Sequence, residues 1–166
     1  MYDDYPHLLA EMFAYSLAAA HLNLPHHIAH GFMVSDTRGS GEGWNIIDSM
    51  PKTQVCDNRP NKDVPHVLHY CQKYMLGNFF FSKYRLRKDF LSCGAALLME
   101  PTSSIVYESH QITPDGIRKE PVNEKIAKRN AFVLCTLFPA LNEASKFYKD
   151  HHCDGKAIYA KKYTLI

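Results

Sequence analysis

The pattern of apolar and polar residues predicts a helix near each end of the chain. Residues 8–22 are rich in strong helix formers and contain neither Gly nor Pro, which predicts the first helix. Because most of its residues are apolar, we expect it to be mostly buried. Glu11 is the only carboxylate in this stretch. It lies either on the solvent side or inside with a partner, and the second case indicates a functional site.

The last third of the chain predicts a long helix. Residues 123–151 carry an apolar stripe at roughly helical spacing, which we expect to form core. Asn123 is suited to the N-cap position, and Glu124 places negative charge in the first turn, where the helix dipole favours it. Pro139 lacks an N–H group, so we expect it to kink or divide this helix.

Short apolar runs between the two helices predict strands at residues 31–34 and 67–71, and a strand or loop at residues 79–84. Residues 35–43 include three glycines and predict a mobile loop, which is either a surface connection or a substrate cover. The polar, proline-containing residues 51–65 predict a long connection.

Composition and charge exclude several classes of protein. The chain has 166 residues, of which 46% are hydrophobic and 12% aromatic, enough for a single domain with a core. Its net charge of +2 gives no field that would indicate nucleic acid as a partner. Residues 131–141 form the longest nearly apolar run, which is shorter than the ~20 residues that span a bilayer. The first residues lack the features of a secretory signal, so the protein is cytosolic or its beginning is missing.

Five cysteines occur without a CxxC pair, which argues against a zinc ribbon. They are compatible with one or two disulfides in an oxidising lumen, and equally with buried free thiols.

Residues 65–83 carry the most informative chemistry. His69 stands at the end of a short apolar run, and a glycine, an aromatic cluster and Lys83 follow it. An imidazole at a strand end can bind a divalent ion, and a lysine one loop later can neutralise phosphate charge. This arrangement is suited to a metal-bound diphosphate, although a histidine between apolar neighbours is more often a hydrogen-bonded core residue.

Four segments occur together in a specific order: Ala10–Leu24, Met33–Val34, Pro65–Tyr70 and Gly77–Lys83. In this order the chain resembles the plant and algal peptidyl serine α-galactosyltransferases and hydroxyproline O-arabinosyltransferases. These enzymes have a helix of the type Glu-Met-Tyr-Gly-Tyr, a His-Tyr pair at a strand end, and a Val-Gly-Asn-Trp-x-Phe-x-Lys segment.

The resemblance implies an α/β fold of the GT-A type, with a mixed sheet, flanking helices and a long C-terminal helix. Residues 1–166 would be one domain, with 1–105 as the family-like core and 106–166 as a C-terminal helical extension. The implied reaction is retaining transfer from a UDP-sugar to serine or hydroxyproline of glycoproteins, with a divalent metal, often Mn²⁺. The implied location is the Golgi or endoplasmic reticulum lumen.

The resemblance also implies the site residues. His69 matches the histidine that completes metal coordination, Glu11 matches the acidic, catalytic residue near the sugar and acceptor, and Lys83 matches a lysine that binds the diphosphate. The other implied substrate-binding residues are Tyr15, Tyr70, Gly77 and Asn78.

The chain departs from the family pattern in three places. It contains no Asp-x-Asp triplet, so we expect it to be the C-terminal half of a catalytic domain, inactive alone and held to a membrane only through a missing upstream anchor. Phe79 replaces the usual tryptophan and Leu76 the usual valine.

The alternative is a non-catalytic metal-binding or scaffold module. Ten histidines occur in the chain, and two groups could gather into a metal site. These are His66-x-x-His69-x-Cys71 and His151-His152-Cys153.

Overall fold

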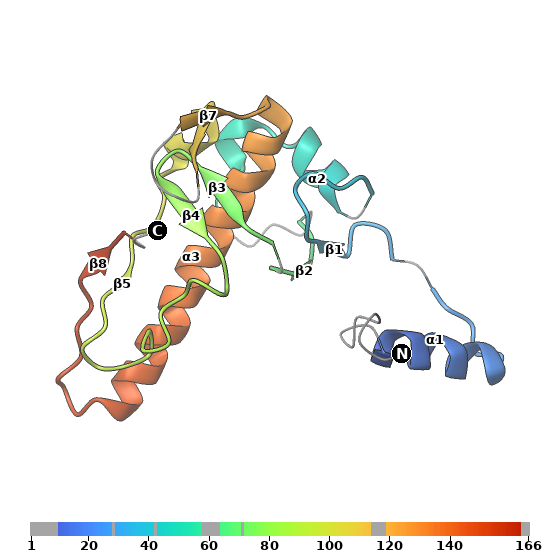
Figure 1. The fold of residues 1–166 in the computed structure, drawn as a ribbon, viewed down its shortest axis with the longest axis horizontal. Helices are drawn as coiled ribbons and strands as arrows, with labels where there is room; N and C mark the ends of the chain where they lie inside the picture. The colour runs from blue at the N-terminus through green and yellow to red at the C-terminus, as the bar shows by residue number, and fades with distance from the viewer. Residues whose placement is uncertain are drawn as a thin grey trace.

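The computed structural model (Figure 1) describes residues 10–27, 29–41, 43–57, 64–70, 72–113 and 119–163. It confirms a mixed α/β class with a long C-terminal helix. In chain order the elements are α1 (Ala10–His21), β1 (Met33–Val34), α2 (Trp44–Ser49), the 3₁₀ helix η2 (Lys52–Gln54), β2 (Val67–Leu68), β3 (Tyr74–Leu76), β4 (Phe79–Phe81), β5 (Leu97–Leu98), the 3₁₀ helix η3 (Ser103–Tyr107), β6 (His110–Ile112), β7 (Lys119–Pro121), α3 (Glu124–His152) and β8 (Lys161–Lys162).

The strands of the described residues form four separate pairs rather than one mixed sheet. The pairs β1–β2 and β5–β8 are parallel, whereas β3–β4 and β6–β7 are antiparallel. A single bridge between Gly77 and Gln111 links the β3–β4 turn to β6. Both strand directions therefore occur, as a mixed sheet requires, but in small units.

Helix α3 begins as its sequence indicates. The side chain of Asn123 accepts a hydrogen bond of 2.9 Å from the backbone N–H of Lys125, and Glu124 lies in the first turn. The helix continues through Pro139 without a break, which excludes division, one of the two expected outcomes, while a kink there stays a prediction. Pro139 removes one helical hydrogen bond. Since Leu137 and Phe138 beside it are buried in the core, tertiary packing maintains the helix.

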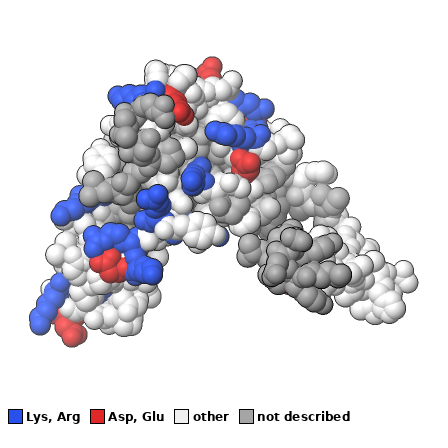
Figure 2. Space-filling view, in the orientation of Figure 1, with Lys and Arg blue, Asp and Glu red and all other residues white. Residues whose placement is uncertain are grey.

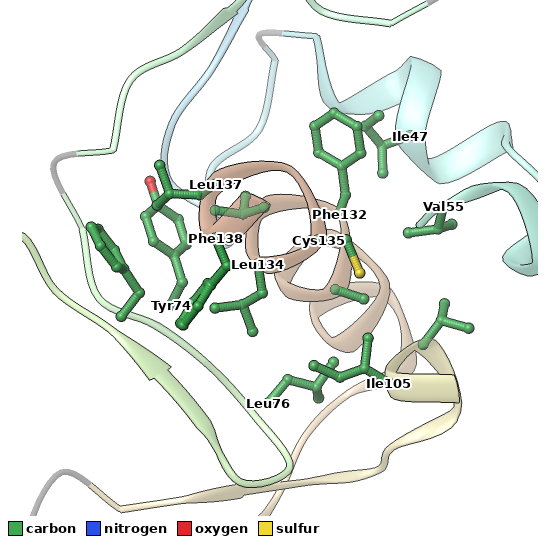
Figure 3. Close-up of a cluster of buried hydrophobic side chains, with 14 of the residues drawn as sticks. Ile47, Val55, Tyr74, Leu76, Ile105, Phe132, Leu134, Cys135, Leu137 and Phe138 are labelled. Atoms are coloured by element: carbon green, nitrogen blue, oxygen red, sulfur yellow. The ribbon is translucent and has the colours of Figure 1, made fainter. Parts of the chain in front are cut away.

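The core is built around α3, which runs through the centre of the body in Figure 1. Figure 3 shows Phe138 of α3 beside Tyr74 of β3, and Phe132 beside Ile47 of α2. Tyr74, Ile47 and Trp44 are fully buried. Large buried side chains of this kind each contribute on the order of 2 kcal/mol to folding, so the packing of α2 and β3 on α3 positions the segments between them.

Two disulfides join distant parts of the chain to α3, which decides between paired cysteines and free thiols. Cys56 is bonded to Cys135 in the middle of α3, and Cys93 to Cys153 at its end. The fifth residue, Cys71, lies outside the described residues.

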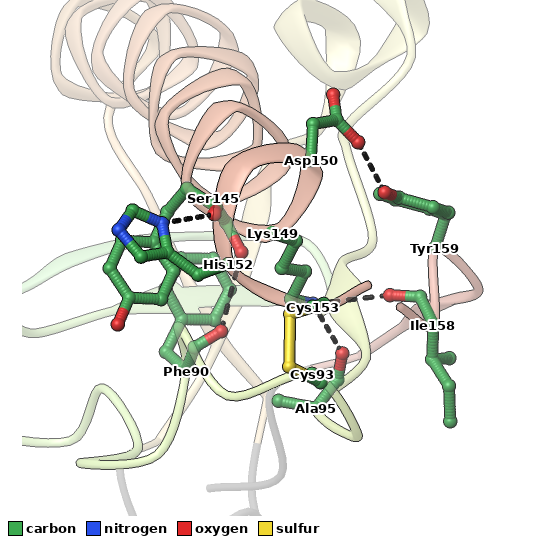
Figure 4. The surroundings of a disulfide bond; sticks show 11 residues. Phe90, Cys93, Ala95, Ser145, Lys149, Asp150, His152, Cys153, Ile158 and Tyr159 are labelled. Atoms are coloured by element: carbon green, nitrogen blue, oxygen red, sulfur yellow. Dashed lines mark hydrogen bonds between the residues drawn. A yellow bond between two sulfur atoms is a disulfide. The ribbon is translucent and has the colours of Figure 1, made fainter. Parts of the chain in front are cut away.

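Figure 4 shows Lys149 beside the bond between Cys93 and Cys153. Its side chain is buried, and Nζ donates to the backbone oxygens of Ala95 at 2.6 Å and Ile158 at 3.1 Å. Burial lowers the pKa of Lys149. The lysine and the disulfide together hold the chain after α3 against the segment before β5.

Helix α1 forms where the sequence predicts it, but the expectation that it is mostly buried is wrong. Met12, Phe13, Tyr15 and Leu17 are all more than half exposed, and Ala19 is the one buried residue of the helix. In Figure 1, α1 lies apart from the body. Apolar composition creates a need for burial, but the described part of the body offers no surface that meets it.

Within the described ranges, no helix combines the length and the apolar character needed to cross a bilayer.

Candidate functional site

The parallel pair β1–β2 creates an edge where two loops meet. Met33 pairs with Val67, and Val34 with Leu68, so both strands end at the same side. Side chains at the carboxyl ends of parallel strands commonly form ligand sites in α/β proteins. The loop after β1 and the segment after β2 are therefore the first places to look for a site.

A pocket of about 340 Å³ lies at this edge, and we call it the strand-end pocket. Asp36, Thr37 and Arg38 from the loop after β1 line it, and so do Gln72 and Lys73 from the segment after β2. Its volume is in the range of small-molecule sites. Residues far apart in sequence thus form one cavity because their strands pair in parallel.

The other lining residues of the strand-end pocket come from α3 and from elements packed around it. Met75 of β3, Gln111 of β6 and Ile126 and Asn130 of α3 line it. Ser82 and Tyr84, which follow β4, complete it. The pocket is consequently a product of the whole body rather than of one loop.

Tyr74 ties the two loops at this edge together. Its buried hydroxyl group lies 2.9 Å from the backbone oxygen of Ser35 and 3.2 Å from that of His69. The backbone N–H of His69 donates to the oxygen of Val34 at 2.9 Å, which extends the pairing beyond β2. These contacts hold the backbone after each strand in register with the other.

Arg129 of α3 anchors the next part of the loop after β1. Its Nη1 donates to the backbone oxygens of Thr37 at 3.0 Å and Gly39 at 2.9 Å, while Trp44 Nε1 donates to the oxygen of Asp36 at 2.8 Å. The sequence predicts a mobile loop over residues 35–43. The structure instead anchors its first half through three carbonyl groups, because buried donors face them.

Arg129 itself forms a bidentate ion pair with Asp48. Its Nε and Nη2 lie 2.8 and 2.6 Å from the two carboxylate oxygens of Asp48, and its guanidinium stacks over Trp44 at 5.0 Å. The hydrogen bonds from Arg129 lower the pKa of Asp48; burial opposes this, and the charges of Arg129 and Lys125 add to it. The pair fixes the guanidinium so that its third nitrogen can bind the loop.

Acid is therefore expected to weaken the fold through Asp48. A carboxyl group whose pKa is lower in the folded state stabilises the protein fully above its unfolded pKa of about 4, and loses this contribution as the pH falls through the folded pKa. We expect the free energy of unfolding to fall more steeply below about pH 4 in the native chain than in Asp48→Asn. Urea titrations of both proteins at several pH values measure this difference, and equal slopes would contradict it.

The strand-end pocket carries unpaired positive charge. Arg38 and Lys73 line it, and neither forms an ion pair with another residue of the described ranges. Asp36 also lines it, and one of its carboxylate oxygens accepts the backbone N–H of Arg38 at 2.9 Å. Figure 2 shows Lys and Arg side chains over the body, interrupted by a few acidic residues. Two cations against one carboxylate favour an anion in the pocket.

Asn130 is the unusual polar residue of the strand-end pocket. It is 4% exposed, and its Oδ1 has no hydrogen-bond partner among the residues that the structure describes. Nearly all buried polar side-chain atoms in native proteins have a partner, so each exception needs an explanation.

The structure places the residues assigned to the site by resemblance at three locations. Glu11 and Tyr15 are exposed on α1, apart from the body, and the Tyr15 ring contacts His26 at 5.6 Å. His69 and Tyr70 follow β2 and are exposed, with the Tyr70 ring against Phe81 at 6.1 Å. The structure does not bring α1 to the end of β2.

The third location is the β3–β4 hairpin and the residues after it. Gly77 and Asn78 form its two-residue turn, and Gly77 has a φ of +55°. A side chain there would be strained, so the turn by itself accounts for the glycine. Lys83 is exposed, and its Nζ lies 5.1 Å from the centre of the Tyr84 ring. Its neighbours Ser82 and Tyr84 line the strand-end pocket, whereas Lys83 does not.

The histidine groups of the alternative hypothesis show other contacts. His151 and His152 each direct Nδ1 to a backbone oxygen one turn earlier, at 2.7 and 2.8 Å, and the sulfur of Cys153 is bonded to Cys93. In the other group, Cys71 lies outside the described residues. In the part of the chain that the structure describes, no three His, Cys, Asp or Glu side chains gather as metal ligands would.

Sequence reasoning missed Arg38, Lys73, Asn130 and the pair of Arg129 with Asp48. One signal was available, because Arg129 is a charge inside the apolar helix pattern between Ile126 and Phe132. Such a charge needs a partner when it is buried. Nothing local marks Asp48 as that partner, because only folding brings the two together.

Comparison with known proteins adds no assignment, since no family model, no curated protein and no solved structure matches this chain.

Proposed function

We propose that this protein belongs to a retaining glycosyltransferase of the GT-A type, which transfers a sugar from a UDP-sugar to serine or hydroxyproline of glycoproteins. The ordered motifs between Glu11 and Lys83 are the basis of the proposal. The observation that best supports it is the strand-end pocket, which is cationic and lies where parallel strands end. A nucleotide diphosphate is an anion, so a cationic pocket at the ends of parallel strands is suited to bind it.

The arrangement of the elements also supports a larger catalytic domain. Parallel strands normally belong to sheets covered on both faces, yet β1–β2 and β5–β8 are pairs of two-residue strands. Helix α1 exposes its apolar residues. In the proposal, further polypeptide packs on α1 and extends the β1–β2 pair, and the same polypeptide supplies the Asp-x-Asp triplet.

A metal site needs more than the one histidine that the proposal assigns to it. The proposal assigns His69 to Mn²⁺, but one imidazole holds a divalent ion weakly and several further ligands are needed. No such set gathers within the described residues. The part that the proposal assigns to the described residues is electrostatic: Arg38 and Lys73 stabilise negative charge on a bound diphosphate.

The proposed location is the Golgi or endoplasmic reticulum lumen. The bonds Cys56–Cys135 and Cys93–Cys153 support it, because disulfides persist in oxidising compartments and are rare in the cytosol.

The test uses the protein purified from the cells that produce it. Isothermal calorimetry measures its binding of UDP-galactose and of UDP-arabinose in the presence of MnCl₂. We expect His69→Ala to weaken binding about tenfold or more, since metal ligands and their supporting groups have effects of this size. His30→Ala, another exposed histidine, is the matched control. Equal affinity of the two variants removes His69 from the site, and no binding by the native protein rejects the function.

A second candidate is the non-catalytic scaffold, which the exposed apolar surface of α1 favours. Met12, Phe13 and Leu17 on one isolated helix are suited to contact with another protein. Purification in a stable complex, without sugar-nucleotide binding, would support this role over the enzyme.

A further inference from the structure

We propose that the strand-end pocket binds a small phosphate ester with free hydroxyl groups, as a sugar phosphate or a nucleotide has. In this assignment Arg38 and Lys73 pair with the phosphate, and the side-chain amide of Asn130 hydrogen-bonds a hydroxyl group. The assignment requires neither a metal ion nor sugar transfer. The phosphate contacts of Arg38 and Lys73 rest on the proposed function, whereas the hydroxyl contact of Asn130 and binding without a metal ion go beyond it. Binding in EDTA is measured separately from the binding of UDP-sugars with MnCl₂, so the failure of one is distinguishable from the failure of the other.

The amide of Asn130 is the first argument. Its Oδ1 is buried without a partner in the described residues, although Asn130 lines the pocket. An unsatisfied buried polar group destabilises a protein, so a site that keeps one has a use for it. A carboxamide presents an acceptor and a donor on the two ends of one plane, and rotation exchanges them. A ligand hydroxyl can pair with either end.

The charges that line the pocket are the second argument. Arg38 follows β1 and Lys73 follows β2, and no carboxylate of the described residues pairs with either. A guanidinium can bind two phosphate oxygens at once, and an ammonium adds a point charge. Because Arg129 and Trp44 hold the backbone around Arg38, the loop is ordered before a ligand arrives, which lowers the entropy lost on binding.

The remaining lining distinguishes a polar ligand from an apolar one. Gln72, Ser82 and Gln111 add amide and hydroxyl groups to the pocket, and these pair well with the hydroxyls of a sugar. Tyr84 is 81% exposed and offers an aromatic face at the same place. A sugar or a base can pack on such a face.

The test compares four probes against the native protein by calorimetry in a buffer with EDTA. The probes are inorganic phosphate, glucose, glucose 1-phosphate and uridine 5′-monophosphate. We expect at least one of the two esters to bind about tenfold or more tightly than both phosphate and glucose, because it engages both the cations and Asn130. The ester that binds more tightly shows whether the ligand is a sugar phosphate or a nucleotide. If neither ester binds more tightly than inorganic phosphate, the proposal is overturned.

Two variants then test the phosphate contacts and the hydroxyl contact separately. Arg38→Gln should weaken phosphate and ester binding alike, by about tenfold, since it removes a charged hydrogen bond. Asn130→Leu should weaken only the esters, by about two- to tenfold. It should not lower the melting temperature, because it removes an unsatisfied buried group. Lys88→Ala removes an exposed charge outside the pocket and is the control. Ester affinity that is equal in Arg38→Gln and Lys88→Ala, or unchanged in Asn130→Leu, contradicts the assignment.

Discussion

Replacing Arg129 with alanine is expected to lower the free energy of unfolding by about 3 kcal/mol, the lower end of the range seen when one partner of a buried ion pair is removed, because Asp48 is only partly buried and lies 3.3 Å from Lys125 as well. The side chain is 3% exposed and makes four hydrogen bonds, two to Asp48 and one each to the carbonyls of Thr37 and Gly39. Alanine would leave the carboxylate of Asp48 without its main partner and two carbonyls without donors. Removal of the guanidinium also opens a cavity above Trp44.

Urea unfolding followed by tryptophan fluorescence measures this effect, because Trp44 is the only tryptophan of the chain and lies against the guanidinium. Arg129→Lys should recover only a part, since an ammonium cannot bind both carboxylate oxygens and two carbonyls in one plane. Lys146→Ala, an exposed residue of the same helix, controls for charge and helix propensity. If Arg129→Ala lowers the free energy of unfolding as little as Lys146→Ala does, the ion pair of Arg129 with Asp48 contributes little to stability.

A double variant tests the interpretation further. Asp48→Leu combined with Arg129→Met removes both charges and keeps apolar volume. We expect it to be more stable than Arg129→Ala, because no buried charge is left unpaired. The backbone of residues 37–39 still loses its donors in this variant. Arg38 should then bind phosphate more weakly, which separates the stabilising role of Arg129 from its role in positioning the loop.

Loss of the two disulfides is the second large effect that we expect. Cys56 and Cys135 are separated by 79 residues, and Cys93 and Cys153 by 60. Cross-links that close long loops stabilise a fold by about 2–4 kcal/mol each, mainly by restricting the unfolded chain. A single domain has only about 5–15 kcal/mol in total, so the reduced protein should be largely destabilised.

The paired variants Cys56→Ala/Cys135→Ala and Cys93→Ala/Cys153→Ala measure each bond separately. The second should also loosen the segment after α3, which Lys149 holds through Ala95 and Ile158. Intact mass and a thiol titration of the unreduced, denatured protein check the pairing beforehand. More than one reactive thiol per chain, or variants as stable as the native protein under oxidising conditions, would contradict the prediction.

Short-range features of the sequence predicted several elements well. Asn123 caps α3, Met33 and Val34 form a strand, and residues 10–21 form a helix. Each of these depends on neighbouring residues within a few positions, through capping, alternation or helix propensity. The mixed α/β class, which the resemblance implied, is also the class that the structure shows.

Expectations about burial and division failed where they depended on the surroundings. Composition made α1 a helix but could not supply a surface to cover it. Pro139 weakens a helix locally, yet the core packing of Phe138 and Leu137 keeps α3 continuous. The glycines of residues 35–43 indicated mobility, whereas the donors that hold this loop come from Arg129, far along the chain.

The sequence alone therefore specifies the helix near each end of the chain, the apolar runs at residues 31–34 and 67–71, and the ordered motifs from Glu11 to Lys83, because these are properties of short segments. The strand-end pocket belongs to the tertiary structure. It exists because Met33 pairs with Val67 and because α3 brings Asn130 to the same edge. Contacts between such distant segments produce no pattern in the sequence of either segment. The residues that line the pocket can therefore be identified only from the folded structure.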